Sequence, residues 1–445
     1  MKRVLLTFAA LLAAALASSA QTARQAIEAN PDLAGGIYYV DDFSVRSAAP
    51  APKGYKPFYI SHYGRHGARN YGSNAEFDRI MEILKDAEAK DNLTDLGKDL
   101  LAQYSEAWPL LHFRANDLTD LGWQQHRDIA GRMVGACPRV FKGKGRKVLA
   151  SATVIPRCMM SMAAFCERLQ EFNPGLEIST VASEACMGEL NPFTGHNPQV
   201  RPTDAGYDNK YAAWWPALNE YSARVIKADA FAARLLRDPS LLPKGVNPVR
   251  FMRYIFHIAA TAKDGGFEGD YWKYFTMDEI YSKFLESNLK MYLSKGPDSL
   301  VQGGRQWAFA NYFMEKVLDE AEADMAAGDV AARLRFGHDI TIISTLKLLD
   351  VNGWNKSAGS FDGVPDVWQF YNMPMASNLQ FVFYRNRKGD VLVRAMLNER
   401  DLVFPVKSDF SPYYRWDDFR DFALGRIDYA KHIIATTKAP SRHKR

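Results

Sequence analysis

The sequence predicts an α/β fold with a mostly parallel central sheet flanked by helices and a mainly helical inserted subdomain. Three segments support this prediction, because in each a short apolar or β-branched run passes into a polar turn and then into residues at helical spacing. They lie near residues 58–67, 147–169 and 335–349. The chain has 445 residues, 47% of them hydrophobic and 24% charged, as is ordinary for a folded protein.

The first twenty residues, 1–20, have the pattern of a secretory signal peptide. Lys2 and Arg3 precede an apolar run from Val4 to Ala17, and small residues follow up to Ala20. The run is shorter than the roughly 20 residues needed to span a bilayer, so a membrane anchor is the weaker alternative. We expect cleavage after Ala20, a periplasmic or secreted protein, and no transmembrane segment in the mature chain.

Residues 21–200 and 331–435 are expected to form a discontinuous α/β core. The first strand, Phe58–His62, follows a proline-containing linker and opens into a glycine-bearing turn. In open α/β sheets, functional groups sit at strand ends of this kind. We therefore look for a site after this strand.

Two further units repeat the passage from strand to helix. Lys147–Ala152 leads to Arg157 and a helix, and Arg335–Asp339 leads into a helix over residues 340–349. An amphipathic helix containing Ala310, Phe313, Val317 and Ala321 precedes the last unit. Arg and His thus recur at strand ends, which fits a sheet whose strands meet at one anion site.

Residues 201–330 predict a helical insertion, because they hold few alternating runs and many aromatic residues at three- and four-residue spacing. The pattern Leu-Thr-Asp-Leu-Gly occurs at 93–97 and at 118–122. We interpret both copies as helix starts with Thr as the N-cap. Residues 436–445 form a basic tail.

Charge and cysteines give little functional information. Removal of Lys2 and Arg3 lowers the formal net charge of +5 by two, and the basic tail accounts for the remainder, so we infer no nucleic-acid partner. On one helix, Cys158 and Cys166 are about 12 Å apart, too far for a disulfide. Cys137 and Cys186 could each bond to one of them, or all four could remain thiols.

The turn after the first strand is the most informative part of the chain. Arg65 and Arg69 flank His66, with Gly64 and Gly67 beside it. Guanidinium groups match phosphate oxygens, and nearby positive charge keeps an imidazole neutral and nucleophilic. A satisfied loop histidine is the alternative for a lone Arg-His-Gly tripeptide. A metal site built on His62 and His66 is weaker still, because such ligands usually need a helix.

Here the sequence resembles the histidine phosphatase superfamily, in particular its branch of acid phosphatases, phytases and multiple inositol polyphosphate phosphatases. The resemblance rests on ordered blocks between about residues 56 and 400. These blocks are Arg65–Arg69, Leu118–Gly122 with Gln125, Ala150–Ser151 with Arg157 and Phe165, His338–Asp339, and Pro374–Leu379 with Val393–Asn398. Agreement of several blocks in order is far more specific than any single motif.

The resemblance implies a phosphoric monoester hydrolase that forms a phosphohistidine. His66 would be the nucleophile and Asp339 the proton donor to the leaving group. Arg65, Arg69, Arg157 and His338 would bind the phosphate of a small-molecule phosphate ester. Neither a metal nor a cofactor is required. Acidic pH optima are expected, unless the charge of the bound phosphate raises the pKa of Asp339.

The substrate is left open at this point. Arg157–Met159 resembles the inositol polyphosphate phosphatases, which favours phytate, but those enzymes tend to have His-Ala-Glu where this chain has His338–Asp339. Asn70 and Tyr71 also depart from the family's usual pattern. A general acid phosphatase for sugar or other organic phosphates is the alternative. A mutase-like or regulatory phosphatase and a binding module without turnover are weaker alternatives.

Overall fold

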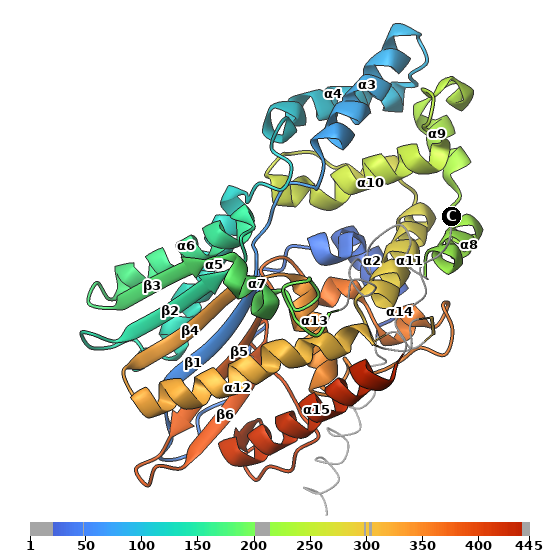
Figure 1. Cartoon of the computed structure of the whole chain (residues 1–445). Coiled ribbons are helices and arrows are strands. Elements are labelled where there is room, and N and C mark those ends of the chain that lie inside the picture. The colour runs from blue at the N-terminus through green and yellow to red at the C-terminus, as the bar shows by residue number, and fades with distance from the viewer. Residues whose placement is uncertain (1–20, 48, 201–213, 298–299, 302–304, 438–445) are drawn as a thin grey trace, which may run out of the picture.

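A single mixed sheet organises the molecule. The computed structural model describes residues 21–47, 49–200, 214–297, 300–301 and 305–437 (Figure 1). Its eight strands lie in the order β3-β2-β4-β1-β5-β6-β7, and β8 also pairs with β6. The strands are β1 Lys56–Arg65, β2 Lys147–Ala152, β3 Glu177–Ala182, β4 Val330–Gly337, β5 Asn378–Arg385, β6 Val391–Leu397, β7 Arg400–Asp401 and β8 Tyr413–Arg415.

The sheet has a parallel half and an antiparallel half. Strands β3, β2, β4 and β1 run parallel, whereas β5 pairs antiparallel with β1, and β6, β7 and β8 continue in antiparallel pairing. The expected α/β class is confirmed, and the expected strands fall in β1, β2 and β4. The sheet itself is mixed rather than mostly parallel, because β5 to β8 add antiparallel pairs beyond β1. The carboxyl ends of these three neighbouring strands share one edge, where their functional residues meet.

Helices cover both faces of the sheet. The long helices are α3 Asn74–Ala89, α4 Asp95–Leu111, α5 Asp120–Ala136, α6 Pro156–Phe172, α8 Trp215–Val225, α10 Pro248–Gly265, α11 Met277–Ser294, α12 Ala310–Ala327, α13 Asp339–Leu348 and α15 Trp416–Thr436. The short helices are α2 Ala23–Ala29, α7 Glu184–Leu190, α9 Ala228–Leu235 and α14 Val364–Val367, with 3-10 turns that include η1 Pro31–Tyr38 and η5 Phe370–Asn372.

The side chains of β1 alternate between two hydrophobic cores, one on each face of the sheet. Tyr59 and Tyr63 point into the core shared with α12, α13 and α15, whereas Ile60 points into the core shared with α5 and α6. Successive strand residues face opposite sides, so a strand buried on both faces contributes alternate side chains to two separate cores. The result is a three-layer arrangement with α5 and α6 on one face and α12 and α15 on the other (Figure 1).

A group of helices lies beyond the functional edge of the sheet. Helices α9 and α10 come from the expected insertion, and they pack against α3 and α4 from the earlier part of the chain (Figure 1). Helix α12 lies instead along β1 and β4. The exact boundaries of the core and the insertion stay a prediction, as do the signal peptide at 1–20 and most of the basic tail, which lie outside the described residues.

The structure confirms the expected helix starts at the two Leu-Thr-Asp-Leu-Gly segments and decides between the alternatives left open for the cysteines. Thr94 and Thr119 are the N-caps of α4 and α5, and their hydroxyl oxygens accept hydrogen bonds from the N–H groups of Gly97 and Gly122. The four cysteines are free thiols, so neither disulfide connectivity is present. None of the helices in the described ranges is long and apolar enough to cross a membrane.

Candidate active site

The carboxyl ends of β1, β2 and β4 bring the predicted residues together. Arg65 ends β1 and pairs in register with Gly337 at the end of β4. The N–H of His66 donates to the carbonyl of Gly337 over 3.0 Å. Arg157 lies in the first turn of α6, directly after β2, and His338 and Asp339 begin α13.

The loop that follows β1 is held by two helices behind it. Ser161 of α6 accepts a hydrogen bond from the N–H of Gly67 over 3.1 Å, and Gln125 of α5 accepts one from the N–H of Ala68 over 2.9 Å. A Cβ atom on Gly67 would lie 2.3 Å from the carbonyl oxygen of Gly122, a distance that real Cβ atoms do not reach. Gly67 and Gly122, which face each other, are therefore both needed for the close approach of this loop to α5.

His66 is oriented by its own loop. Its Nδ1 lies 2.9 Å from the carbonyl oxygen of Gly67, which can only accept, so the ring proton is on Nδ1 and the lone pair is on Nε2. The ring of His338 lies edge-on to it, with centroids 5.8 Å apart. Burial and the neighbouring charges of Arg65, Arg157 and Arg69 lower the pKa of His66 well below its ordinary value. The ring is therefore neutral at physiological pH.

Arg65 is fully buried and fixed by backbone carbonyls. Its Nη1 donates to the carbonyls of Ile37, Met373 and Pro374 over 2.6, 3.0 and 3.0 Å. These contacts leave its Nε without a partner among the described residues. A rigid, under-satisfied guanidinium is suited to binding an anion.

Arg69 and Arg157 repeat this pattern of unsatisfied donors. The Nε atoms of both are buried and lack a protein partner in the described part of the chain. The guanidinium of Arg69 lies 5.4 Å from the ring centre of Tyr38, and burial together with Arg69 lowers the pKa of Arg157. Around one neutral histidine, three guanidinium groups thus each keep a buried Nε without a partner among the described residues, and a bound anion could accept hydrogen bonds from them.

His338 is also neutral at physiological pH. Its Nε2 lies 3.4 Å from the hydroxyl of Thr153, and its backbone N–H donates to the hydroxyl of Tyr63 over 2.9 Å. Burial, reinforced by Arg157, lowers the pKa of His338 to about 3. Its neutral imidazole ring can therefore donate a ring N–H to a bound anion without carrying charge itself.

Asp339 lies beside a cation that sequence reasoning missed. The Nζ of Lys295, which follows α11, is 3.8 Å from one Asp339 oxygen, and that oxygen accepts no hydrogen bond from the residues that the structure describes. Burial would raise the pKa of Asp339, but the charges of Lys295 and Arg65 outweigh it and hold the pKa below its ordinary value. No motif marks Lys295, because it comes from an ordinary helix end 44 residues earlier in the chain.

A cavity of about 370 Å³ extends from this edge toward the helices beyond it. Tyr38 and Lys295 line it, and so do His257, Lys290 and Tyr71. The Tyr71 ring, at a position where the sequence departs from the family pattern, stacks on His257 with ring centres 4.2 Å apart. The site is thus bounded by aromatic and basic groups of the helical part.

The other candidates lie elsewhere. Basic residues of the expected insertion, such as Lys210 and Arg224, are candidates for further contacts with a substrate. Arg224 is exposed and paired with Asp362, and Lys210 lies outside the described residues. His62 packs between Phe165 and Phe336, so it does not join His66 in a metal site. Within the described ranges, no group of three or more His, Cys, Asp or Glu side chains could hold a metal ion.

Similar solved structures share this architecture. The multiple inositol polyphosphate phosphatase of Bifidobacterium longum, in complex with inositol hexasulfate, matches with a TM-score of 0.68 and 17% identity over 86% of this chain and 95% of that chain. This chain has the same fold as that phosphatase. The phytase of D. castellii matches with a TM-score of 0.63 and 13% identity, over 92% of this chain and 88% of that one.

A Hafnia alvei phytase in complex with tartrate has a TM-score of 0.51 and 14% identity, over 85% of this chain and 99% of that chain. No family model and no curated protein matches the sequence. The likeness therefore rests on structure, and it confirms at the level of the fold the resemblance that the spaced motifs indicated.

Proposed function

We propose that the chain is an exported phosphomonoesterase that acts through a phosphohistidine on His66, with inositol polyphosphates as its substrates. The observation that supports it most directly is the hydrogen bond from His66 Nδ1 to Gly67, which leaves the Nε2 lone pair free among three arginines. No cofactor is needed for this chemistry. The phosphatases and phytases with the same fold add support.

In the first step, Nε2 of His66 attacks phosphorus and the ester P–O bond breaks. The electron pair leaves with the alkoxide, which takes a proton from Asp339. The charge on the transferred oxygens is stabilised by three arginines and by the ring N–H of His338. The arginines are Arg65, Arg69 and Arg157. In the second step, water attacks phosphorus, the P–N bond breaks, and Asp339 accepts the water's proton.

A proton donor must be protonated, whereas the cations beside Asp339 favour its ionised form. A bound phosphate monoester brings up to two negative charges to the same cations. It therefore neutralises the field that lowers the pKa of Asp339, so that the proton is taken up with the substrate. Activity is expected on the acidic side of neutrality, where this uptake is easiest.

Lys295 and the basic lining of the adjacent cavity favour a polyphosphate. In the sequence, the next basic residue after Arg69 is Arg79, whereas Lys290 and Lys295 line the cavity beside the loop in the folded chain. Lys283 and Arg253 also line that cavity and form ion pairs with Glu286, while Lys295 lies beside Asp339 and Lys290 lies over the ring of Trp215. A general acid phosphatase remains the second candidate, because the arginine clamp alone binds any phosphoryl group.

Phosphate release from inositol hexakisphosphate, a sugar monophosphate and phosphotyrosine tests both candidates with the purified mature chain. We expect the lowest Michaelis constant for the hexakisphosphate and an increase of that constant with added salt, since several charges are screened together. Equal constants at low salt would leave the general acid phosphatase. No release from any ester would leave a binding module.

A further inference from the structure

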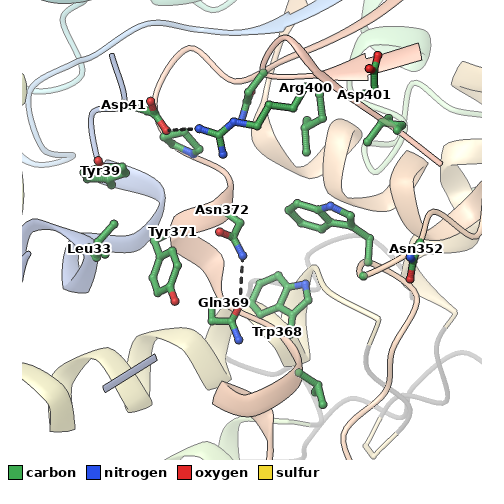
Figure 2. A pocket seen from close by; sticks show the side chains of 17 residues that line it. Leu33, Tyr39, Asp41, Asn352, Trp368, Gln369, Tyr371, Asn372, Arg400 and Asp401 are labelled. Carbon is green, nitrogen blue, oxygen red and sulfur yellow. Dashed lines mark hydrogen bonds and ion pairs between the residues drawn. The ribbon is translucent and has the colours of Figure 1, made fainter. Parts of the chain in front are cut away.

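A second cavity, of about 590 Å³, lies apart from the proposed reaction (Figure 2). Three segments form it: the chain around η1, residues 352–374, and the β6–β7 hairpin. It shares no lining residue with the cavity that contains Lys295. Pro374 forms part of its wall, while the carbonyl of the same residue accepts from Arg65, so the cavity lies behind the phosphate-binding arginine. Its volume is in the range of small-molecule sites.

The lining combines aromatic rings with planar polar side chains. The rings are Tyr39, Trp354, Trp368 and Tyr371. The planar polar groups are Asn352, Gln369, Asn372 and Asn398, together with Asp41 and Asp401 (Figure 2). Aromatic faces cover apolar C–H surfaces, and amide and carboxylate groups can hydrogen-bond to pairs of neighbouring hydroxyls.

The charges of this cavity are balanced, unlike those of the arginine site. Asp41 lies 3.6 Å from Arg400, and Asp401 lies 2.5 Å from the buried Arg394. No surplus of positive charge is therefore available to hold a phosphate or a sulfate. The lining favours a polar ligand without net charge.

One buried donor on this wall lacks a partner among the residues described. Trp368 is 2% exposed, yet its Nε1 makes no hydrogen bond within the described part of the chain. Trp368 and Asn352 are both among the residues that line the cavity, and Asn352 is exposed (Figure 2). An orphaned buried donor costs stability and commonly marks a missing ligand or water.

We propose that this cavity is a binding site for a neutral saccharide, with a pyranose ring packed against the aromatic side chains and its hydroxyls bonded to the amides. This site is independent of the phosphatase chemistry proposed above. It would give the enzyme a second, uncharged recognition element next to a strongly cationic one. Trp354 is the preferred aromatic contact, because it is half-buried and makes no ring contact with another described aromatic side chain.

Saturation-transfer NMR with the purified mature chain tests the site. The probes are the methyl glycosides of glucose, mannose and N-acetylglucosamine, each measured alone and with excess inositol hexasulfate to fill the arginine site. Trp354→Leu removes the aromatic contact, and Asn352→Ala changes an exposed side chain that does not threaten folding. Trp108→Leu is the matched control, a half-buried tryptophan on α4.

We expect at least one glycoside to receive saturation at its C–H protons in the wild type and in Trp108→Leu, with or without the hexasulfate. Affinity should fall about tenfold in Trp354→Leu, the loss expected for one aromatic contact, and should also fall in Asn352→Ala. Phosphate release, measured on the same samples, should be unchanged in both variants. Transfer to none of the glycosides, equal affinity in all variants, or displacement by the hexasulfate would overturn the proposal.

Discussion

At the scale of the residue, protonation states determine what the candidate site can do. His66 is neutral because it is buried among arginines, and Asp339 is ionised because Lys295 and Arg65 outweigh its burial. His66 thus has its nucleophilic, neutral form before the substrate binds, whereas Asp339 takes up its proton when the substrate binds. Variants of Asp339 and of Lys295 test the role of this carboxyl group and its protonation.

Replacement of Asp339 by Asn should affect esters in proportion to the basicity of their leaving group. An alkyl phosphate needs a proton on the departing oxygen, so its turnover should fall by about 10²- to 10⁴-fold. A nitrophenyl ester leaves as a stable anion, and its turnover should fall less than about tenfold. Turnover numbers for the two esters give the comparison, and equal losses would remove Asp339 from the role of proton donor.

Lys295→Met should move the alkaline limit of activity to higher pH. Lys295 lowers the pKa of Asp339, so its removal raises that pKa and keeps the carboxyl protonated at higher pH, by about one pH unit for an ion pair of this separation. The pH profile of kcat/KM with a sugar monophosphate measures the shift. Lys98→Met, at an exposed position of α4, is the control, and an identical shift there would mean a general charge effect.

At the scale of the element, three strand-to-helix junctions build the site. The sequence predicted these junctions correctly, because an apolar run followed by a polar turn is a local signal. It also predicted the N-caps Thr94 and Thr119, whose effect is local too. Lys295 and the carbonyls of Met373 and Pro374 that hold Arg65 were missed as parts of the site. Their roles depend on packing between distant segments, which leaves no periodicity or motif in the chain.

The contact between the Arg-His-Gly loop and α5 can be tested with two glycines of the same helix. In Gly122→Ala the new Cβ would lie 2.2 Å from the carbonyl oxygen of Ala68, so we expect a loss of about 2 kcal/mol or more in the free energy of unfolding and a large loss of activity. At Gly135, a Cβ meets nothing within 4 Å. Gly135→Ala should therefore be neutral or stabilise by up to about 1 kcal/mol.

Urea unfolding of the two variants measures the difference between them. Similar stability of Gly122→Ala and Gly135→Ala would show that the loop and α5 can separate at little cost. Their activities on a nitrophenyl ester then report whether the close approach of the two elements matters for the position of His66.

At the scale of the whole molecule, the buried histidines link the fold to pH. Burial lowers the pKa values of His62 and His126 to about 3, whereas in the unfolded chain each has an ordinary value near 6.5. Below pH 6.5 the unfolded chain therefore binds protons that the folded chain does not. Stability should be fully present above pH 6.5 and fall as the pH decreases toward 3, by at most about 1.4 kcal/mol per pH unit for each histidine.

His62→Phe should reduce this acid sensitivity, because the new ring cannot be protonated and its site already lies between Phe165 and Phe336. The free energy of unfolding at pH 7 and pH 5 gives the measurement. His432→Phe, on the exposed face of α15, serves as the control and should keep the wild-type pH dependence. An unchanged slope in His62→Phe would mean that this histidine is protonated in the folded state.

Rapid acid-free quenching of the enzyme during turnover of a labelled phosphate ester shows directly whether His66 carries the phosphoryl group. Peptide mass spectrometry should place the phosphate on His66, and the label should be stable in base, labile in acid and absent from His66→Ala. A label that survives acid but not base would indicate an acyl phosphate. Its presence on another residue, or its persistence in His66→Ala, would contradict the account.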